Sequence, residues 1–341
     1  MMKARKLALT ILFTAAFAAS WAQSSYNAYS FLGVTSSSHV YGMGGHNVSL
    51  VGEDINVIEQ NPALLGPELE MQVGLNYMRY LGTSNFMGAR FGMPINARCA
   101  WSAAVEYYGY GSFTATDLAG NVIGTFNAGD IAFSGTFAHD INDRWRAGIT
   151  AKVLSSHYES YSALALGVDL GVSYYNAERD FAFGVTIKNL GGQVKRFTDE
   201  HEALPWDIQM GITKGLGQTP FRLSITVTNM RRWKLNYYTP ADPSNPSAGL
   251  KENNSFISNL FRHLTFGLEY SPSNKFYLCL GYDHKTKTDM STYQRNFISG
   301  FTLGGGFKVR GFGIGASVAQ PHTGGLTLML NLTTNITELL N

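Results

Sequence analysis

Apolar residues recur at every second position in one segment after another, from position 71 to the end of the 341-residue chain. Because successive side chains of a β-strand point to opposite faces, this period is typical of strands with one apolar face. The run 163–174 shows it clearly, since Leu, Val and Tyr hold the even positions and Ala, Gly, Asp and Ser hold the odd ones. The pattern predicts an all-β fold of about fourteen strands. These lie near 71–80, 85–93, 98–108, 128–138, 144–154, 163–174, 181–189, 206–214, 221–230, 263–270, 275–283, 297–308, 311–318 and 325–335.

The predicted connections between these strands alternate in length. Short turns of about two to five residues follow every second strand, and most of the intervening links are longer. The longer links are 109–127, 155–162, 190–205, 231–262 and 284–296. Short turns at one end, long loops at the other and an even strand number are typical of outer-membrane β-barrels. We therefore predict that 71–341 form a fourteen-stranded transmembrane barrel of a Gram-negative outer membrane, with its loops at the cell surface and its termini in the periplasm.

The shortage of charge agrees with a barrel. Only 15% of the residues are charged, against about 25% in an ordinary soluble domain. A secreted soluble β-sandwich is the alternative fold, but its outward faces should carry Lys and Glu, whereas one whole face is apolar here. After the N-terminal region, no window approaches the roughly 18 uninterrupted apolar residues of a transmembrane helix. The formal net charge of +2 gives no reason to expect a nucleic-acid partner.

The N-terminus carries the marks of export. Lys3, Arg5 and Lys6 precede an apolar run at 7–19, which is followed by small residues that end at Ala22. This order is typical of a secretory signal peptide. We therefore predict that residues 1–22 are a signal peptide, removed by cleavage after Ala22.

The segment 23–70 separates the signal from the first predicted strand and lacks strand alternation. A short helix is predicted to end before Pro62, because the residue before a proline disfavours helical backbone. The acids of this region are Glu53, Asp54 and Glu59. The predicted lumen offers them five cations, Arg90, Arg146, Lys152, Lys188 and Arg222. We predict an N-terminal hatch, or plug, held partly by charge; the alternative is that these acids face periplasmic water.

Four motifs carry a resemblance to known barrels. They are Gly-Gly-His-Asn-Val-Ser-Leu-Val at 44–51, Asn-Pro-Ala-Leu-Leu at 61–65, Leu-Pro-Trp-Asp-Ile-Gln-Met-Gly at 204–211 and Arg-His-Leu-Thr-Phe-Gly-Leu-Glu-Tyr at 262–270. The chain resembles the FadL-like class, whose members combine an N-terminal hatch and an Asn-Pro-Ala element with fourteen strands. Within that class it is similar to the PorQ family of the type IX secretion system.

The resemblance implies a non-enzymatic outer-membrane protein that takes part in protein secretion rather than in lipid transport. The implied partners are PorZ and, through PorZ, the sortase complex of PorU and PorV, which together form an attachment complex at the cell surface. Outer-membrane lipid and lipopolysaccharide are the implied surroundings. The family pattern supplies no catalytic residue.

The sequence holds no convincing catalytic or cofactor-binding constellation. Glu-His-Glu at 200–202 lacks the second His at helical spacing that a zinc protease needs. The glycine run 304–306 lacks the strand, turn and helix of a dinucleotide-binding loop. Cys99 and Cys279 are predicted on separate strands far apart in the sequence, so we expect packed thiols rather than a disulfide. The chain is therefore predicted to be no enzyme and to hold no metal or cofactor.

The longest predicted loop, 231–262, is rich in aromatic residues. Exposed aromatic side chains beside a polar loop suit a partner surface. The candidate partner-binding residues are Trp233, Tyr237, Tyr238, Phe256 and Phe261. Two alternatives stay open: the loop folds over its own barrel, or basic residues near it meet the phosphates of lipopolysaccharide.

Two functions of different classes therefore compete. One is a non-enzymatic anchor for a surface partner, and the other is a FadL-like channel for hydrophobic small molecules. The lumen distinguishes them, because a channel needs a continuous apolar pocket and an exit, whereas the predicted lumen is polar and lined with small residues. A third class, the general porin, needs an open aqueous lumen, which a plug would close.

Overall fold

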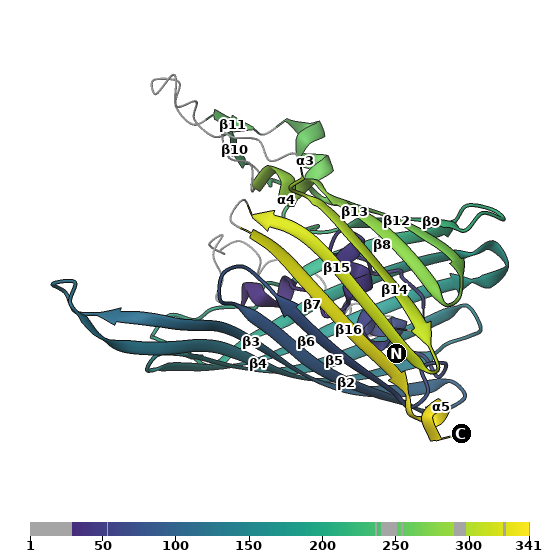
Figure 1. The fold of residues 1–341 in the computed structure, drawn as a ribbon, viewed down its shortest axis with the longest axis horizontal. Helices are drawn as coiled ribbons and strands as arrows, with labels where there is room; N and C mark the ends of the chain where they lie inside the picture. The colour runs from purple at the N-terminus through teal and green to yellow at the C-terminus, as the bar shows by residue number, and fades with distance from the viewer. Residues whose placement is uncertain are drawn as a thin grey trace, which may run out of the picture.

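Fourteen strands close into one antiparallel barrel in the computed structural model of the protein (Figure 1). The structure describes residues 29–52, 54–235, 237–239, 251–253, 255–289, 298–322 and 325–340, so the predicted signal peptide, 1–22, lies outside the described residues. The barrel closes where β1 pairs with β16, from Gln72 opposite Asn335 to Arg79 opposite Leu328. The predicted fourteen-stranded barrel is confirmed.

Each barrel strand overlaps one of the fourteen predicted segments. The strands are β1 (Gln72–Arg79), β2 (Asn85–Asn96), β3 (Cys99–Thr116), β4 (Val122–Asp140), β5 (Trp145–Tyr158), β6 (Tyr161–Asn176), β7 (Phe181–Lys195), β8 (Asp207–Gly215), β9 (Phe221–Val227), β12 (Leu264–Ser273), β13 (Phe276–Asp283), β14 (Phe301–Val309), β15 (Phe312–His322) and β16 (Gly325–Asn335).

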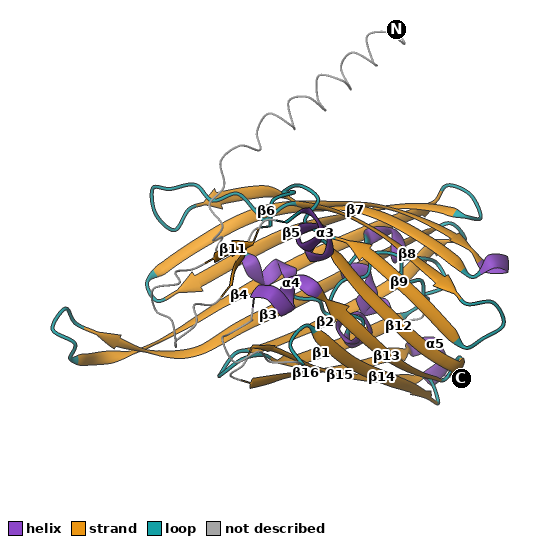
Figure 2. Ribbon diagram, turned by 90° about the horizontal axis from the view of Figure 1, so that it is seen from above, coloured by secondary structure: helices purple, strands orange, loops and turns teal. Residues whose placement is uncertain are grey.

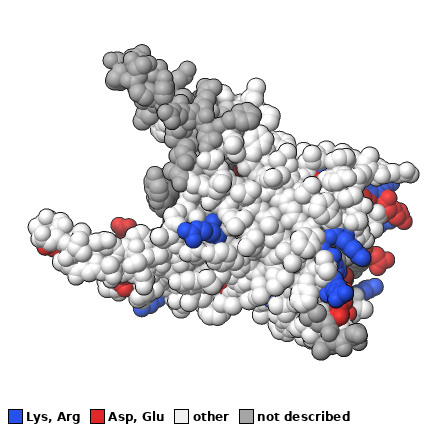
Figure 3. All heavy atoms as spheres, viewed as in Figure 1, with Lys and Arg blue, Asp and Glu red and all other residues white. Residues whose placement is uncertain are grey.

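The apolar face of the strands points outward. In β6, Leu166 and Leu170 are 48% and 40% exposed, whereas Ala165 and Asp169 on the other face are buried. On the face seen in Figure 3, Lys, Arg, Asp and Glu gather mainly at one end of the barrel and leave most of the wall uncharged. A closed sheet leaves no unpaired edge in lipid. This construction is that of an integral outer-membrane β-barrel.

No helix among the described residues is long and apolar enough to cross a membrane. The helices are short and lie inside the barrel or at its ends (Figure 2).

Two of the predicted long links are shorter in the structure. β5 ends at Tyr158 and β6 begins at Tyr161, so the link predicted at 155–162 is a tight turn. β7 continues to Lys195, into the link predicted at 190–205. The prediction of a long loop was wrong at 155–162, because strand pairing continues past the point where the apolar alternation weakens. The second prediction was wrong only in its start, since 196–206 still form a loop between β7 and β8.

The link predicted at 109–127 is mostly strand as well. β3 runs to Thr116 and β4 begins at Val122, and their pairing continues from the barrel wall to this end. Both views show this hairpin extending well beyond the neighbouring strands (Figures 1 and 2). The loop prediction was wrong because Thr, Phe, Val and Ile favour paired strands beyond the barrel wall as well.

The two ends of the barrel differ. The helix α5 (Ile336–Leu340) follows β16 at the end with the short turns, which we call the turn end. The opposite, loop end carries four small elements that lie away from the C-terminus (Figure 1). They are β10 (Tyr237–Thr239), β11 (Lys251–Asn253), α3 (Phe256–Arg262) and α4 (His284–Asp289).

The N-terminal segment fills the space inside the sheet, and we call its residues 29–70 the plug. It contains η1 (Ser30–Gly33), α2 (Ser38–Gly42), η2 (Ile55–Glu59) and η3 (Pro62–Leu64). The side chains of Ser37, Asp54 and Asn61 cap the last three elements by accepting hydrogen bonds from backbone N–H groups. α2 contacts β13 to β16, η2 contacts β1 and β2, and η3 contacts β4 to β6. The plug therefore touches opposite sides of the barrel.

Candidate functional site

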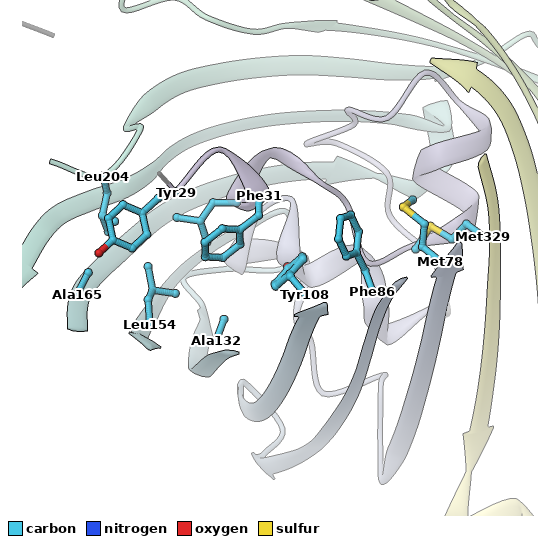
Figure 4. Packing of buried hydrophobic residues seen from close by; sticks show 11 residues of the cluster. Tyr29, Phe31, Met78, Phe86, Tyr108, Ala132, Leu154, Ala165, Leu204 and Met329 are labelled. Carbon is cyan, nitrogen blue, oxygen red and sulfur yellow. The ribbon is translucent and has the colours of Figure 1, made fainter. Parts of the chain in front are cut away.

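The loop-end half of the lumen holds an apolar cluster that the plug fills (Figure 4). The ring of Phe31 lies 4.7 Å from that of Tyr108, which lies 5.1 Å from that of Phe86. The buried members are Tyr29, Phe31, Leu32, Met78, Phe86, Tyr108, Ala132, Leu154, Ala165, Leu204 and Met329. The lumen was predicted to be polar and lined with small residues; in its loop-end half, inward-facing apolar residues near the strand ends meet the side chains of the plug instead.

The helix α2 approaches the wall closely because small residues line the wall there. A Cβ on Gly42 would lie 2.6 Å from Cys279 Sγ and 2.8 Å from Gly304 Cα, so a larger residue would push the helix away. The hydroxyl of Thr302 accepts a hydrogen bond from Gly44 N (2.9 Å) and donates one to Gly42 O (2.8 Å). Cys279 is one of two free thiols in the described chain.

A buried ion pair joins the plug to β7. The carboxylate of Glu59 lies 2.6 Å from Lys188 Nζ. The Gln60 amide donates to the other oxygen of Glu59 at 2.7 Å. Beside this pair, Asn61 of the Asn-Pro-Ala motif donates to the Val172 carbonyl of β6 at 3.3 Å. These contacts hold η2 and η3 against one side of the barrel.

Arg146 contacts the plug through a different acid from those predicted. Its guanidinium lies 2.7 Å from Glu68 and also pairs with Asp140 of β4. Glu68 is an acid of the plug that was not among the predicted contact residues. Of the predicted plug acids, Asp54 caps η2 and accepts a hydrogen bond from Ser37 at 2.8 Å, whereas Glu53 lies outside the described residues.

The three other predicted cations pair with acids of the wall instead of the plug. Lys152 lies 2.6 Å from Asp169 on the neighbouring β6. Arg90 lies 3.5 Å from Glu106 on β3. Arg222 pairs with Asp180 at 3.1 Å, in the turn before β7. These cations pair with wall acids on the next strand or in a nearby turn, which is why the predicted plug pairing does not form at these positions.

A second link between plug and wall was not predicted. His39 Nε2 of α2 lies 3.0 Å from Glu269 of β12, and its ring stacks on Tyr277 at 3.9 Å. Glu269 is recognisable in the sequence as an inward acid of a strand. His39 is not, because it belongs to a segment without alternation whose direction in space no pattern reports.

A cavity of about 170 Å³ lies between the plug and β13 to β15. Tyr41, Tyr80 and Phe301 supply aromatic surface to it, and His46 and Asp283 supply polar groups. Its volume is below the roughly 300 Å³ of the smallest drug-sized pockets. It is close to the roughly 150 Å³ of an engineered cavity that holds benzene.

The predicted partner-binding residues divide into two groups. Phe256 and Tyr238 are 67% and 60% exposed, and Ile257, beside Phe256 on α3, is 68% exposed. The Trp233 ring is about half exposed and stacks on His263 at 4.9 Å. We call Trp233, Tyr238, Phe256 and Ile257 the rim patch.

The remaining two make contacts inside the loop and with the barrel. The guanidinium of Arg262 in α3 lies 4.7 Å from the centre of the Tyr237 ring, a contact within the loop. Phe261 packs against Phe266 of β12 and against His284 of α4. The contact between Phe261 and Phe266 agrees with the alternative that part of the loop folds onto its own barrel.

Comparisons with known proteins identify barrels with a similar fold. No known family model matches the chain, and no curated protein matches it. The toluene transporter TbuX of Ralstonia pickettii is 12% identical, with a TM-score of 0.50 over 89% of this chain and 98% of its own. The toluene transporter TodX of Pseudomonas putida is 12% identical, with a TM-score of 0.52 over 88% and 97%. The monoaromatic hydrocarbon channel CymD is 12% identical, with a TM-score of 0.52 over 90% and 99%.

At this level of identity the likeness shows a common fold. The protein shares the barrel fold of these three proteins, which are named as transporters or channels.

Proposed function

We propose that the protein is a non-enzymatic, plugged barrel of the outer membrane that holds a protein complex at the cell surface in type IX secretion. The resemblance of its motifs to the PorQ family supports this proposal. The expected partner is PorZ and, through PorZ, the sortase complex of PorU and PorV. The loop end then faces the cell exterior, and the termini lie in the periplasm.

The filled lumen is the observation that carries this proposal. The plug contacts opposite sides of the barrel, and its polar groups meet wall partners such as Lys188 and Thr302. The apolar side chains of Tyr29 and Phe31 occupy the loop-end half. A lumen filled in this way suits a rigid anchor for a surface protein better than a channel for small molecules.

The rim patch supplies a surface for the mounted protein. Phe256 and Ile257 are about two-thirds exposed at the loop end. Aromatic anchors dominate the binding energy of many protein interfaces.

Retention of PorZ by the tagged barrel, isolated from outer membranes of the native host in mild detergent, tests the proposal. The double variant Phe256→Ser, Ile257→Ser is expected to lose tenfold or more of the retained PorZ, because hot-spot side chains contribute about 2 kcal/mol or more. The matched control is Ile141→Ser, which removes an apolar side chain of similar exposure (55%) at the turn end. Wild-type barrel that retains no PorZ would contradict the proposal.

Passage of hydrophobic small molecules is the second candidate. The cavity of about 170 Å³ and the apolar luminal cluster favour it. The structural comparisons favour it as well, since TbuX and TodX are named as toluene transporters.

Uptake of labelled toluene by cells that lack their own hydrocarbon channel tests this second candidate. Wild-type protein should raise uptake, and Val34→Trp should abolish the gain because Val34 lines the cavity. Ile141→Ser serves again as the control. If PorZ is retained while uptake stays at the level of the empty host, the channel function is wrong.

A further inference from the structure

The hairpin of β3 and β4 extends past the barrel wall as a two-stranded ribbon. β2 begins opposite Gly109, and β5 ends opposite Ala128. Beyond these residues, the stretches 111–116 and 122–127 pair only with each other in the described structure. The ribbon lies at the loop end (Figure 1).

The two edges of the ribbon differ at its base. There, the β3 edge meets the turn between β1 and β2, where the Thr83 hydroxyl donates to the Tyr110 carbonyl at 3.2 Å. The β4 edge, 122–127, has no strand beside it among the described residues. Its sequence, Val-Ile-Gly-Thr-Phe-Asn, holds no Lys, Glu or Pro. Soluble proteins use those residues to protect exposed edges from pairing.

The outward face of the ribbon is more polar than that of the wall. Along β4, Ile131 and Phe133 point outward to lipid, and Thr125 and Asn127 continue the same series in the ribbon. Phe126 belongs to the inward series, and its ring stacks on that of its cross-strand partner Phe113 at 5.5 Å. The outward series also contains Ile123, so the outward face of the ribbon is mixed. A lipid surface is excluded instead by the unpaired backbone of the β4 edge, because lipid offers no hydrogen-bond partners to an open strand edge. The apolar face continues the side of the sheet that lines the lumen.

We propose that the β4 edge at 122–127 accepts an extended strand of the surface protein that the barrel anchors, which adds a third strand to the ribbon. Six residues span about 20 Å, the usual length of a strand. Backbone hydrogen bonds supply the pairing in this mode of binding. The face with Phe113 and Phe126 is covered by the same partner. This inference rests on the proposed anchoring function and adds a second contact surface to the rim patch.

Two lysine variants test the edge. Thr125 and Thr114 are cross-strand partners, so Thr125→Lys and Thr114→Lys add the same charge to the same face at the same height, on opposite edges. Retention of PorZ by the full-length barrel should fall tenfold or more for Thr125→Lys and change less than twofold for Thr114→Lys. A photo-crosslinking residue at Asn127 should join to an edge strand of PorZ. Heat-dependent gel mobility should show that both variants remain folded barrels.

Each other outcome overturns the inference. If Thr125→Lys retains PorZ fully, or if both variants lose it equally, strand addition at 122–127 is wrong while the anchoring function stands. Crosslinks from Asn127 to lipid or to a second copy of this chain would also overturn it. Wild-type barrel that retains no PorZ would overturn both the inference and the proposed function.

Discussion

The Glu59 carboxylate lies 2.6 Å from the Nζ atom of Lys188, and both side chains are less than a tenth exposed. The two residues are 129 positions apart in the chain. Their pairing joins the plug to β7. A buried pair of this kind adds little net stability compared with an apolar pair, but the loss of one partner is costly. It therefore favours one position of the plug over others.

Replacement of Lys188 by Met should release the plug. The substitution leaves the Glu59 carboxylate buried without its partner, which costs about 3–5 kcal/mol. We expect higher conductance of single barrels in planar bilayers and faster proteolysis of the plug. Glu59→Gln combined with Lys188→Met should restore much of the closure. The control is Lys308→Met, which breaks the exposed Lys308–Glu338 pair and should cost less than about 1 kcal/mol.

Gly42→Ala should displace α2 from the wall. The added Cβ would lie 2.8 Å from Gly304 Cα, a backbone atom that cannot move without shifting β14. Overpacking of this kind costs about 1–3 kcal/mol. Gly33→Ala is the control, since a Cβ at Gly33 meets nothing within 4 Å. Equal proteolysis of the plug in the two variants would show that the close approach is unimportant.

Phe133→Arg should destabilise the barrel in lipid vesicles, and Ile123→Arg should not. Phe133 is 54% exposed near the middle of the part of β4 that lies in the wall, where an Arg facing lipid costs about 2–4 kcal/mol. Ile123 is 68% exposed on the ribbon, beyond the barrel wall, where we expect a change within about 0.5 kcal/mol. Unfolding by urea measures both. A similar loss in the two variants would place the ribbon in lipid.

The contact between α3 and α4 should weaken only at acidic pH. Burial would raise the pKa of Asp289, but Lys285 and Arg262 outweigh burial and hold the pKa below its ordinary value of 3.8. A carboxylate with a lowered pKa contributes stability that is present above its unfolded pKa and lost as the pH falls through its folded pKa.

Hydrogen exchange of α3, corrected for the intrinsic rate, should therefore stay constant from pH 7 to about pH 4 and rise only below that. Asp289→Asn should remove this rise of exchange at acidic pH. Asp117→Asn, in the exposed turn of the ribbon, should leave it unchanged. A rise of exchange between pH 7 and pH 5 would contradict the assignment to Asp289.

Strand number and the direction of each side chain could be predicted from the sequence. A two-residue period is a local property of extended backbone, so the outward position of Leu166 and the inward position of Asp169 can be read without the fold. The same pattern does not predict whether a segment is hydrogen-bonded to neighbouring strands. The stretches 111–116 and 122–127 were therefore predicted as a loop, although they form a paired ribbon.

The sequence alone determined a barrel with an apolar outer face, because alternation sets which side of each strand meets lipid. Only the tertiary structure decided the partners inside it. Glu59 meets Lys188, while Lys152 meets Asp169 on the next strand. His39 meets Glu269 although no sequence pattern marks it. Closure of the sheet and the path of the plug bring such distant residues together, and both depend on the whole chain.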